Sequence, residues 1–123
     1  MERVNKIFNS TIYKEYLKRL EAYEEKREFC RHNLEHFLDM SRIAYMMVLE
    51  KNLQYSKEVI YAIGLLHDIG RVEQYEKGIG HHIASFNIAK EILKDIDFKE
   101  EEKTMILEAI ICLLYTSDAA DDG

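Results

Sequence analysis

The sequence contains no proline and only five glycines. Proline breaks helices and glycine weakens them, so long stretches of this chain can stay helical. Tryptophan is also absent, and no apolar run approaches the roughly 18 residues that a membrane-spanning helix needs. The first residues lack the apolar segment of a secretory signal. We therefore expect a helical protein without a membrane span.

Cysteine and positive charge are scarce as well. Only Cys30 and Cys112 are present, so no disulfide framework is expected and a cytoplasmic location is favoured. The chain has 17 Lys and Arg residues and 23 Asp and Glu residues, and this acidic balance argues against binding of nucleic acid through its phosphates. With 123 residues, 47% of them apolar, the chain can form one domain with a core. Composition leaves the oligomeric state open.

The spacing of apolar residues predicts an all-α bundle of about five main helices. No stretch alternates apolar and polar residues as a half-buried strand does. Gly70 is expected to end the third helix in the left-handed conformation, and Val72–Tyr75 to add a short turn. The predicted helices run from Thr11 to about Phe29, from Asn33 to about Lys51, from Lys57 to about Ile69, from near His81 past Leu93, and onward from a capping box of Asp97 and Glu100.

The apolar residues of the first two main helices predict which faces of these helices point inward. In the first main helix the expected inward residues are Ile12, Tyr16, Leu20 and Tyr23. The second main helix carries a second apolar stripe in addition to the one that contains Phe37, and its members are His36, Met40, Ile43 and Met47. A helix that is apolar on two sides is typical of a bundle interior.

The composition changes after Ile111. Residues 112–123 contain no lysine, arginine, glutamate or isoleucine. The stretch from Cys112 to Asp122 resembles the in-frame translation of an adapter used in transposase-based sequencing libraries. We expect a helical domain over residues 1–111 that is incomplete at its C-terminus, followed by a non-native tail over residues 112–123. The alternative is a genuine acidic C-terminus.

His67 and Asp68 stand together at the end of the most apolar predicted helix. A buried carboxylate is costly unless a partner neutralises it. A divalent cation would pair with Asp68 and use a neutral nitrogen of His67. In the other interpretation Asp68 caps the helix or pairs with Arg71, and His67 is a core histidine.

The position of His36 favours the interpretation of His67 and Asp68 as metal ligands. His36 lies on the second apolar stripe, and antiparallel packing of the second and third main helices can bring it close to His67 and Asp68. Two histidines and an aspartate suit Mn²⁺, Fe²⁺, Co²⁺, Ni²⁺ or Zn²⁺ better than Mg²⁺. His32 precedes His36 by one turn, and a His-x₃-His pair can itself hold a metal. We expect His32 instead at the helix start, near the mouth of the pocket.

Three segments of the sequence are similar to the HD-domain superfamily of metal-dependent phosphohydrolases. They are CRHNLEHFLDMSRIA, LLHDIGR and GHHIASFNIA, and the resemblance covers about residues 28–111. In that superfamily a His, a His-Asp doublet and a later Asp bind metal on a helical bundle. By this resemblance the ligands are His36, His67 and Asp68. The later Asp has counterparts only in the suspected tail, so the fourth ligand stays unassigned.

The resemblance implies roles for further residues near the ligands. Arg71 would hold a substrate phosphate, or else complement a helix end or pair with Asp68. His81 would bind a phosphate or a second metal, or else be an exposed histidine at a helix start. Glu35 would support the ligands from outside, or else be a surface carboxylate. His82 is expected to be solvated.

The function implied by the resemblance is metal-dependent hydrolysis of a nucleotide or another small phosphorylated metabolite. The bound metal would activate a water and orient the phosphate. This chain is expected to be an incomplete form of such an enzyme. Two other functions stay open: a non-catalytic HD module that binds a nucleotide in a regulatory role, and an HD-fold iron oxygenase, for which His81 and His82 are the candidate extra ligands.

Overall fold

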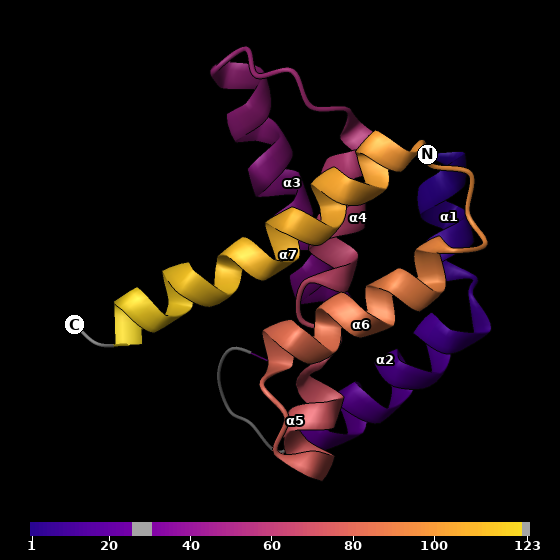
Figure 1. Cartoon of the computed structure of the whole chain (residues 1–123), viewed down its shortest axis with the longest axis vertical. Coiled ribbons are helices and arrows are strands. Elements are labelled where there is room, and N and C mark those ends of the chain that lie inside the picture. The colour runs from indigo at the N-terminus through magenta and orange to yellow at the C-terminus, as the bar shows by residue number, and fades with distance from the viewer. Residues whose placement is uncertain (26–30, 122–123) are drawn as a thin grey trace.

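The computed structural model describes the backbone of residues 1–25 and 31–121, and side chains as far as Cys112. This part of the chain is helical and has no strand, as the sequence predicts. None of its helices is both long and apolar enough to cross a membrane. Figure 1 shows the arrangement of the helices. They are α1 (Glu2–Phe8), α2 (Thr11–Glu24), α3 (Leu34–Glu50), α4 (Lys57–Leu66), α5 (Arg71–Lys77), α6 (His81–Leu93) and α7 (Glu100–Asp121).

Helix α4 is the central element of the bundle. It packs against α1, α3, α6 and α7, which explains why apolar residues surround most of its circumference. Val59, Ala62, Leu65 and Leu66 are all buried. Because other helices surround α4, the residues that directly follow its last turn, His67 and Asp68, are buried.

The predicted helix starts at Thr11 and Lys57 are confirmed, and so is the start near Asn33, which caps α3. Each of the three helices has a side-chain cap. Asn33 Oδ1 accepts a hydrogen bond from the His36 backbone N–H at 2.9 Å, and Ser56 Oγ accepts one from Val59 at 3.1 Å. Such caps satisfy backbone donors that the first helical turn leaves unpaired. The predicted end of the first main helix at Phe29 lies outside the described residues.

The predicted end of α4 at Gly70 is wrong. The helix ends at Leu66, and Gly70 has an ordinary right-handed backbone (φ −73°) before α5. A Cβ on Gly70 would lie 2.2 Å from the backbone nitrogen of Ser85 and 2.5 Å from the carbonyl oxygen of His81. Glycine is therefore needed here because α6 approaches closely. The left-handed glycine is Gly78 (φ 72°), which ends α5, the helix that replaces the predicted short turn.

A second close approach lies on the other side of α4. A Cβ on Gly64 would lie 1.8 Å from Ser41 Oγ of α3, whose hydroxyl donates to the Phe37 carbonyl oxygen at 2.8 Å. The missing side chain lets α3 pack directly on the last turn of α4. Gly64 and Gly70 thus allow α3 and α6 to approach the His67-Asp68 doublet from two sides.

The buried face of α2 differs in part from the prediction. Leu20 is buried and Tyr16 packs against the core, as predicted, but Ile12 and Tyr23 are exposed. The other buried residues of α2 are Tyr13, Leu17 and Glu24. The hydroxyl of Tyr13 donates to the Leu65 carbonyl oxygen at 2.9 Å inside the core. A polar anchor of this kind turns the helix by about one residue from the face that the apolar spacing indicates.

The second apolar stripe of α3 is also predicted wrongly. Met40, Ile43 and Met47 are exposed, with Ile43 at 59%. Figure 1 shows α3 at the edge of the bundle. Helix α3 packs on α4, and its Phe37 is part of the buried core. Within the described residues no other helix covers the opposite side.

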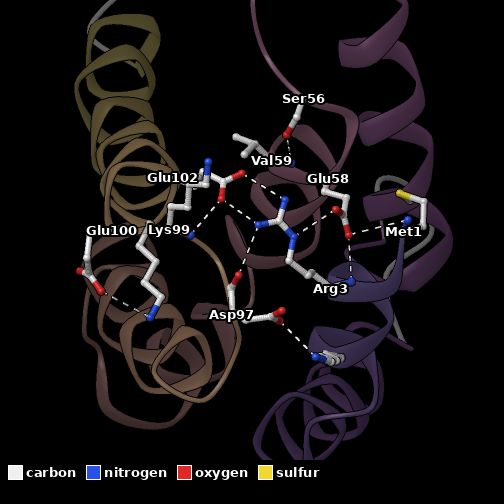
Figure 2. A network of polar contacts seen from close by, with 11 residues as sticks. Met1, Arg3, Ser56, Glu58, Val59, Asp97, Lys99, Glu100 and Glu102 are labelled. Atoms are coloured by element: carbon white, nitrogen blue, oxygen red, sulfur yellow. Dashed lines mark hydrogen bonds and ion pairs between the residues drawn. The ribbon is translucent and has the colours of Figure 1, made fainter.

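Helix α1 was not predicted, and Arg3 ties it to the bundle. Figure 2 shows the Arg3 guanidinium between two carboxylates from different helices. Its Nε donates to Glu58 of α4 at 3.0 Å, and its terminal nitrogens donate to Glu102 of α7 at 2.7 and 3.1 Å. The same guanidinium lies 4.3 Å from the centre of the Phe98 ring. One forked cation therefore joins three helices.

The start of α7 uses Glu102 instead of the predicted capping box of Asp97 and Glu100. Glu102 accepts a hydrogen bond from the Lys99 backbone N–H at 2.9 Å. Helix α7 then runs through residue 111 without a break in the backbone. The domain boundary predicted there remains a prediction.

We expect Arg3→Ala to lower the free energy of unfolding by about 1–2 kcal/mol, since it removes charge-assisted hydrogen bonds to two partly buried carboxylates. Arg3→Lys should recover only part of this loss because an ammonium cannot pair with both carboxylates in a forked geometry. Urea denaturation of the three proteins measures the effect. An alanine variant as stable as the wild type would contradict this role of Arg3.

Candidate metal centre

The side chain of Asp68 lies at the centre of a cluster of imidazoles. Asp68 follows α4 and is only 6% exposed. The Nε2 atom of His67 lies 3.3 Å from Asp68 Oδ2, that of His81 3.6 Å from Oδ1, and that of His32 3.9 Å from Oδ2. Three histidines from different parts of the chain thus turn the same ring nitrogen toward one buried carboxylate.

In each of these three rings the Nδ1 atom, which faces away from Asp68, forms a hydrogen bond with an oxygen atom. A carboxylate or carbonyl oxygen only accepts hydrogen bonds, so when these rings are neutral the proton lies on Nδ1 and the Nε2 atom beside Asp68 is left to bind a cation. The acceptors are the Glu24 carboxylate for His32, the Gly64 carbonyl oxygen at 2.9 Å for His67, and the Gln74 amide oxygen at 2.8 Å for His81.

This donor set fits a divalent metal ion. Neutral imidazoles whose outer nitrogen is hydrogen-bonded, grouped with a carboxylate, are the ligands that Mn²⁺, Fe²⁺, Co²⁺, Ni²⁺ and Zn²⁺ prefer. The ligand atoms of His32, His36 and Asp68 lie within 4.8 Å of one another, and so do those of Asp68, His81 and His82. The centre therefore offers two ligand groups that share Asp68.

The structure places His36 and Asp68 in one group of ligand atoms together with His32, whereas His67 lies beside Asp68 but belongs to neither of the two groups. Two other histidines differ in part from the prediction. His32 directly precedes the cap of α3, at the predicted helix start, and it is buried with its Nε2 atom facing Asp68. His82, predicted to be solvated, is 4% exposed and packs against the ring of His81 at 3.9 Å between centroids. The first turn of α6 directs both of its histidines inward, because α6 approaches the doublet closely at Gly70.

Arg71 adds a positive charge beside the cluster. It is the first residue of α5, and its Nε lies 3.5 Å from Asp68 Oδ2. This buried Nε has no hydrogen-bond partner among the described residues, although an N–H donor normally has one. The guanidinium is thus placed to pair with Asp68.

The other predicted site residues take no part in the described cluster. Glu35 is exposed on the first turn of α3. The later aspartate of the predicted ligand set would have to be Asp118, Asp121 or Asp122, whose side chains lie outside the described residues.

Sequence reasoning missed Glu24 and Gln74, which orient two of the histidines. Glu24 had one available signal. It continues the buried series of Leu17 and Leu20 at helical spacing, and a carboxylate in such a series indicates a buried partner. Gln74 is exposed in α5 and carried no comparable signal.

Burial and the neighbouring charges set the protonation of the centre. Burial raises the pKa of Asp68, but His67 and the Arg71 guanidinium outweigh it and hold that pKa well below its usual range. Burial lowers the pKa of His67, and the Asp68 carboxylate more than reverses this, so the net shift is upward. For His81, burial and then the charge of Arg71 lower the pKa to about 4. At neutral pH the centre thus holds an ionised carboxylate beside the neutral His81.

The lowered pKa of His81 predicts a pH dependence of stability in the metal-free protein. In the unfolded chain this group titrates near its ordinary pKa of about 6.5, so between that pH and about 4 the unfolded state binds more protons. The free energy of unfolding should therefore fall as the pH is lowered through this interval. We expect His81→Ala to lose about 1–2 kcal/mol less than the wild type, after allowing for partial exposure. Urea denaturation with a chelator at about pH 7 and about pH 4.5 measures this, and equal losses would refute the shift.

Comparison with known proteins agrees with the geometry. A protein of Clostridium beijerinckii, described as an uncharacterized protein, is 49% identical over 111 residues, which are 90% of this chain and 71% of that protein. No solved structure matches the chain. The family described as "HD domain", which belongs to a superfamily of metal-dependent phosphohydrolases, matches residues 33–120. That match includes four of the five histidines and Asp68. The chain belongs to the HD domain family.

Proposed function

We propose that the chain binds a divalent metal through His36, His67 and Asp68 and that the activity of this centre is hydrolysis of a phosphate ester. The observation that supports this most strongly is the common orientation of the imidazoles: the Nε2 atoms of His32, His67 and His81 all face the Asp68 carboxylate. A buried carboxylate surrounded in this way gains most from a cation.

The metal we propose is Mn²⁺, Fe²⁺, Co²⁺, Ni²⁺ or Zn²⁺. Nitrogen ligands outnumber oxygen ligands in the cluster, and Mg²⁺ prefers an oxygen-rich octahedral shell with several waters. The fourth ligand remains open.

The residues around the centre suit a phosphorylated substrate. The bound ion would supply a Lewis acid and a water of lowered pKa. Arg71 has a buried Nε without a hydrogen-bond partner among the described residues, and its guanidinium can donate to phosphate oxygens. His81, with its pKa of about 4, is neutral at pH 7, and its Nε2 can accept a proton from the attacking water. The substrate class we propose is a nucleotide or another small phosphate ester.

An iron oxygenase is the second candidate function. The observation that favours it is the second ligand group of Asp68, His81 and His82, which gives the centre the additional histidines that a two-iron site would use. Oxygen consumption by the Fe²⁺-loaded protein, without release of phosphate from any ester, would support this candidate. A regulatory HD module would instead bind a nucleotide with no turnover of either kind.

We expect Asp68→Asn and His67→Ala each to abolish stoichiometric binding of Mn²⁺, because each removes a ligand at the centre of the cluster. Asp39→Asn is the matched control, since Asp39 is an exposed carboxylate on α3. Titration calorimetry and elemental analysis of the dialysed proteins measure the binding. Full metal content in the His67 or Asp68 variant would show that the site is elsewhere.

Hydrolysis of a phosphate ester should depend on the same metal centre. The Mn²⁺-loaded wild type should hydrolyse at least one member of a panel of nucleotides and small phosphate esters, and Asp68→Asn should not. Arg71→Ala should reduce kcat/KM on the order of 100-fold, as expected for loss of a donor that contacts the transferring phosphate. Phosphate release is the measured quantity. Equal hydrolysis by the Arg71 variant would exclude the proposed contact.

A further inference from the structure

We propose that Glu24 is a positioning residue that makes His32 a ligand of the metal centre. This inference rests on the proposed function, since it requires that the cluster around Asp68 binds a metal. Glu24 and His32 both precede residues 33–120, the part that matches the HD domain. Glu24, the last residue of α2, would therefore orient His32 as a ligand, and both residues lie outside the part of the chain that matches the family.

The surroundings of Glu24 support this role. Glu24 is 1% exposed, and a carboxylate so deeply buried needs strong partners. Its Oε1 accepts the hydrogen bond from His32 Nδ1, and its Oε2 accepts one from the hydroxyl of Tyr75 at 2.9 Å. Tyr75 belongs to α5 and stacks on Tyr23 of α2, with 5.0 Å between the ring centroids. The carboxylate at the end of α2 is thus bound by His32 on one side and by Tyr75 of α5 on the other.

The position of the His32 ring follows from this contact. With its proton held on Nδ1 by Glu24, His32 keeps the Nε2 lone pair, and that atom lies 3.9 Å from Asp68 Oδ2. His36 lies beside it with its ring edge-on, 5.3 Å away between centroids. A carboxylate behind a histidine ligand fixes its tautomer and raises its basicity, and losing such a partner commonly weakens metal binding about 10–100-fold.

The chain provides a matched control for Glu24. Glu73 of α5 is also buried and accepts a hydrogen bond from a tyrosine across the same pair of helices, Tyr16 of α2 at 2.9 Å. Its described hydrogen-bond and ion-pair partners are Tyr16 and Lys77 and do not include a histidine. Glu73→Gln therefore has the same chemistry as Glu24→Gln at a comparable buried tyrosine contact.

The test is a titration of the full chain with Co²⁺, followed by visible absorption and calorimetry. We expect Glu24→Gln to weaken Co²⁺ binding about 10–100-fold and to change the ligand-field bands, while Glu73→Gln changes the affinity less than about threefold. His32→Ala should weaken binding by a similar factor. The double variant Glu24→Gln/His32→Ala should be no weaker than His32→Ala alone, because Glu24 acts through His32.

Two results would overturn the inference: wild-type affinity and spectrum in Glu24→Gln, or an equal loss in Glu73→Gln. If Glu24→Gln does not fold, as judged by its thermal unfolding, Tyr75→Phe replaces it. That variant removes one hydrogen bond from Glu24 and should weaken Co²⁺ binding about 3–10-fold, whereas Tyr16→Phe should not. Wild-type protein that binds no Co²⁺ would overturn the proposed function as well. Binding that Asp68→Asn abolishes and Glu24→Gln leaves unchanged would overturn this inference alone.

Discussion

The placement of one buried carboxylate, Asp68, at the end of the central helix governs the rest of the structure. All five histidines of the chain lie in the cluster around it. Packing at two glycines makes this possible, because Gly64 lets α3 approach from one side and Gly70 lets α6 approach from the other. A side chain at either glycine would push the histidine-bearing helices away from Asp68.

Much of this arrangement could be predicted from the sequence, because it depends on local signals. The caps at Asn33 and Ser56 fix where α3 and α4 begin. The His67-Asp68 doublet at the end of α4 then marks the site. These features depend on residues within about one helical turn of each other, which is the range over which sequence patterns are informative.

Features that depend on contacts between distant segments could not be predicted in the same way. Arg3 reaches carboxylates of α4 and α7, and nothing in its sequence neighbourhood indicates those partners. The exposed stripe of α3 that contains Ile43 has the same composition as a buried one, and only the packing of the described helices shows which side is covered. His82 is similar: its burial follows from how close α6 comes to Gly70, a distance that the spacing of residues does not contain.

Electrostatics would give the proposed metal centre its affinity for a cation. The pKa of Asp68 is held well below its usual range, so the carboxylate stays ionised although it is buried. The imidazoles are fixed by acceptors on α2, α4 and α5, so little reorganisation is needed to bind an ion. Anomalous diffraction from a crystal grown with Mn²⁺ tests this most directly. We expect a peak about 2.0–2.3 Å from an Asp68 oxygen and from at least two histidine nitrogens. A peak elsewhere, or none near Asp68 at saturating Mn²⁺, would contradict a metal centre built around this carboxylate.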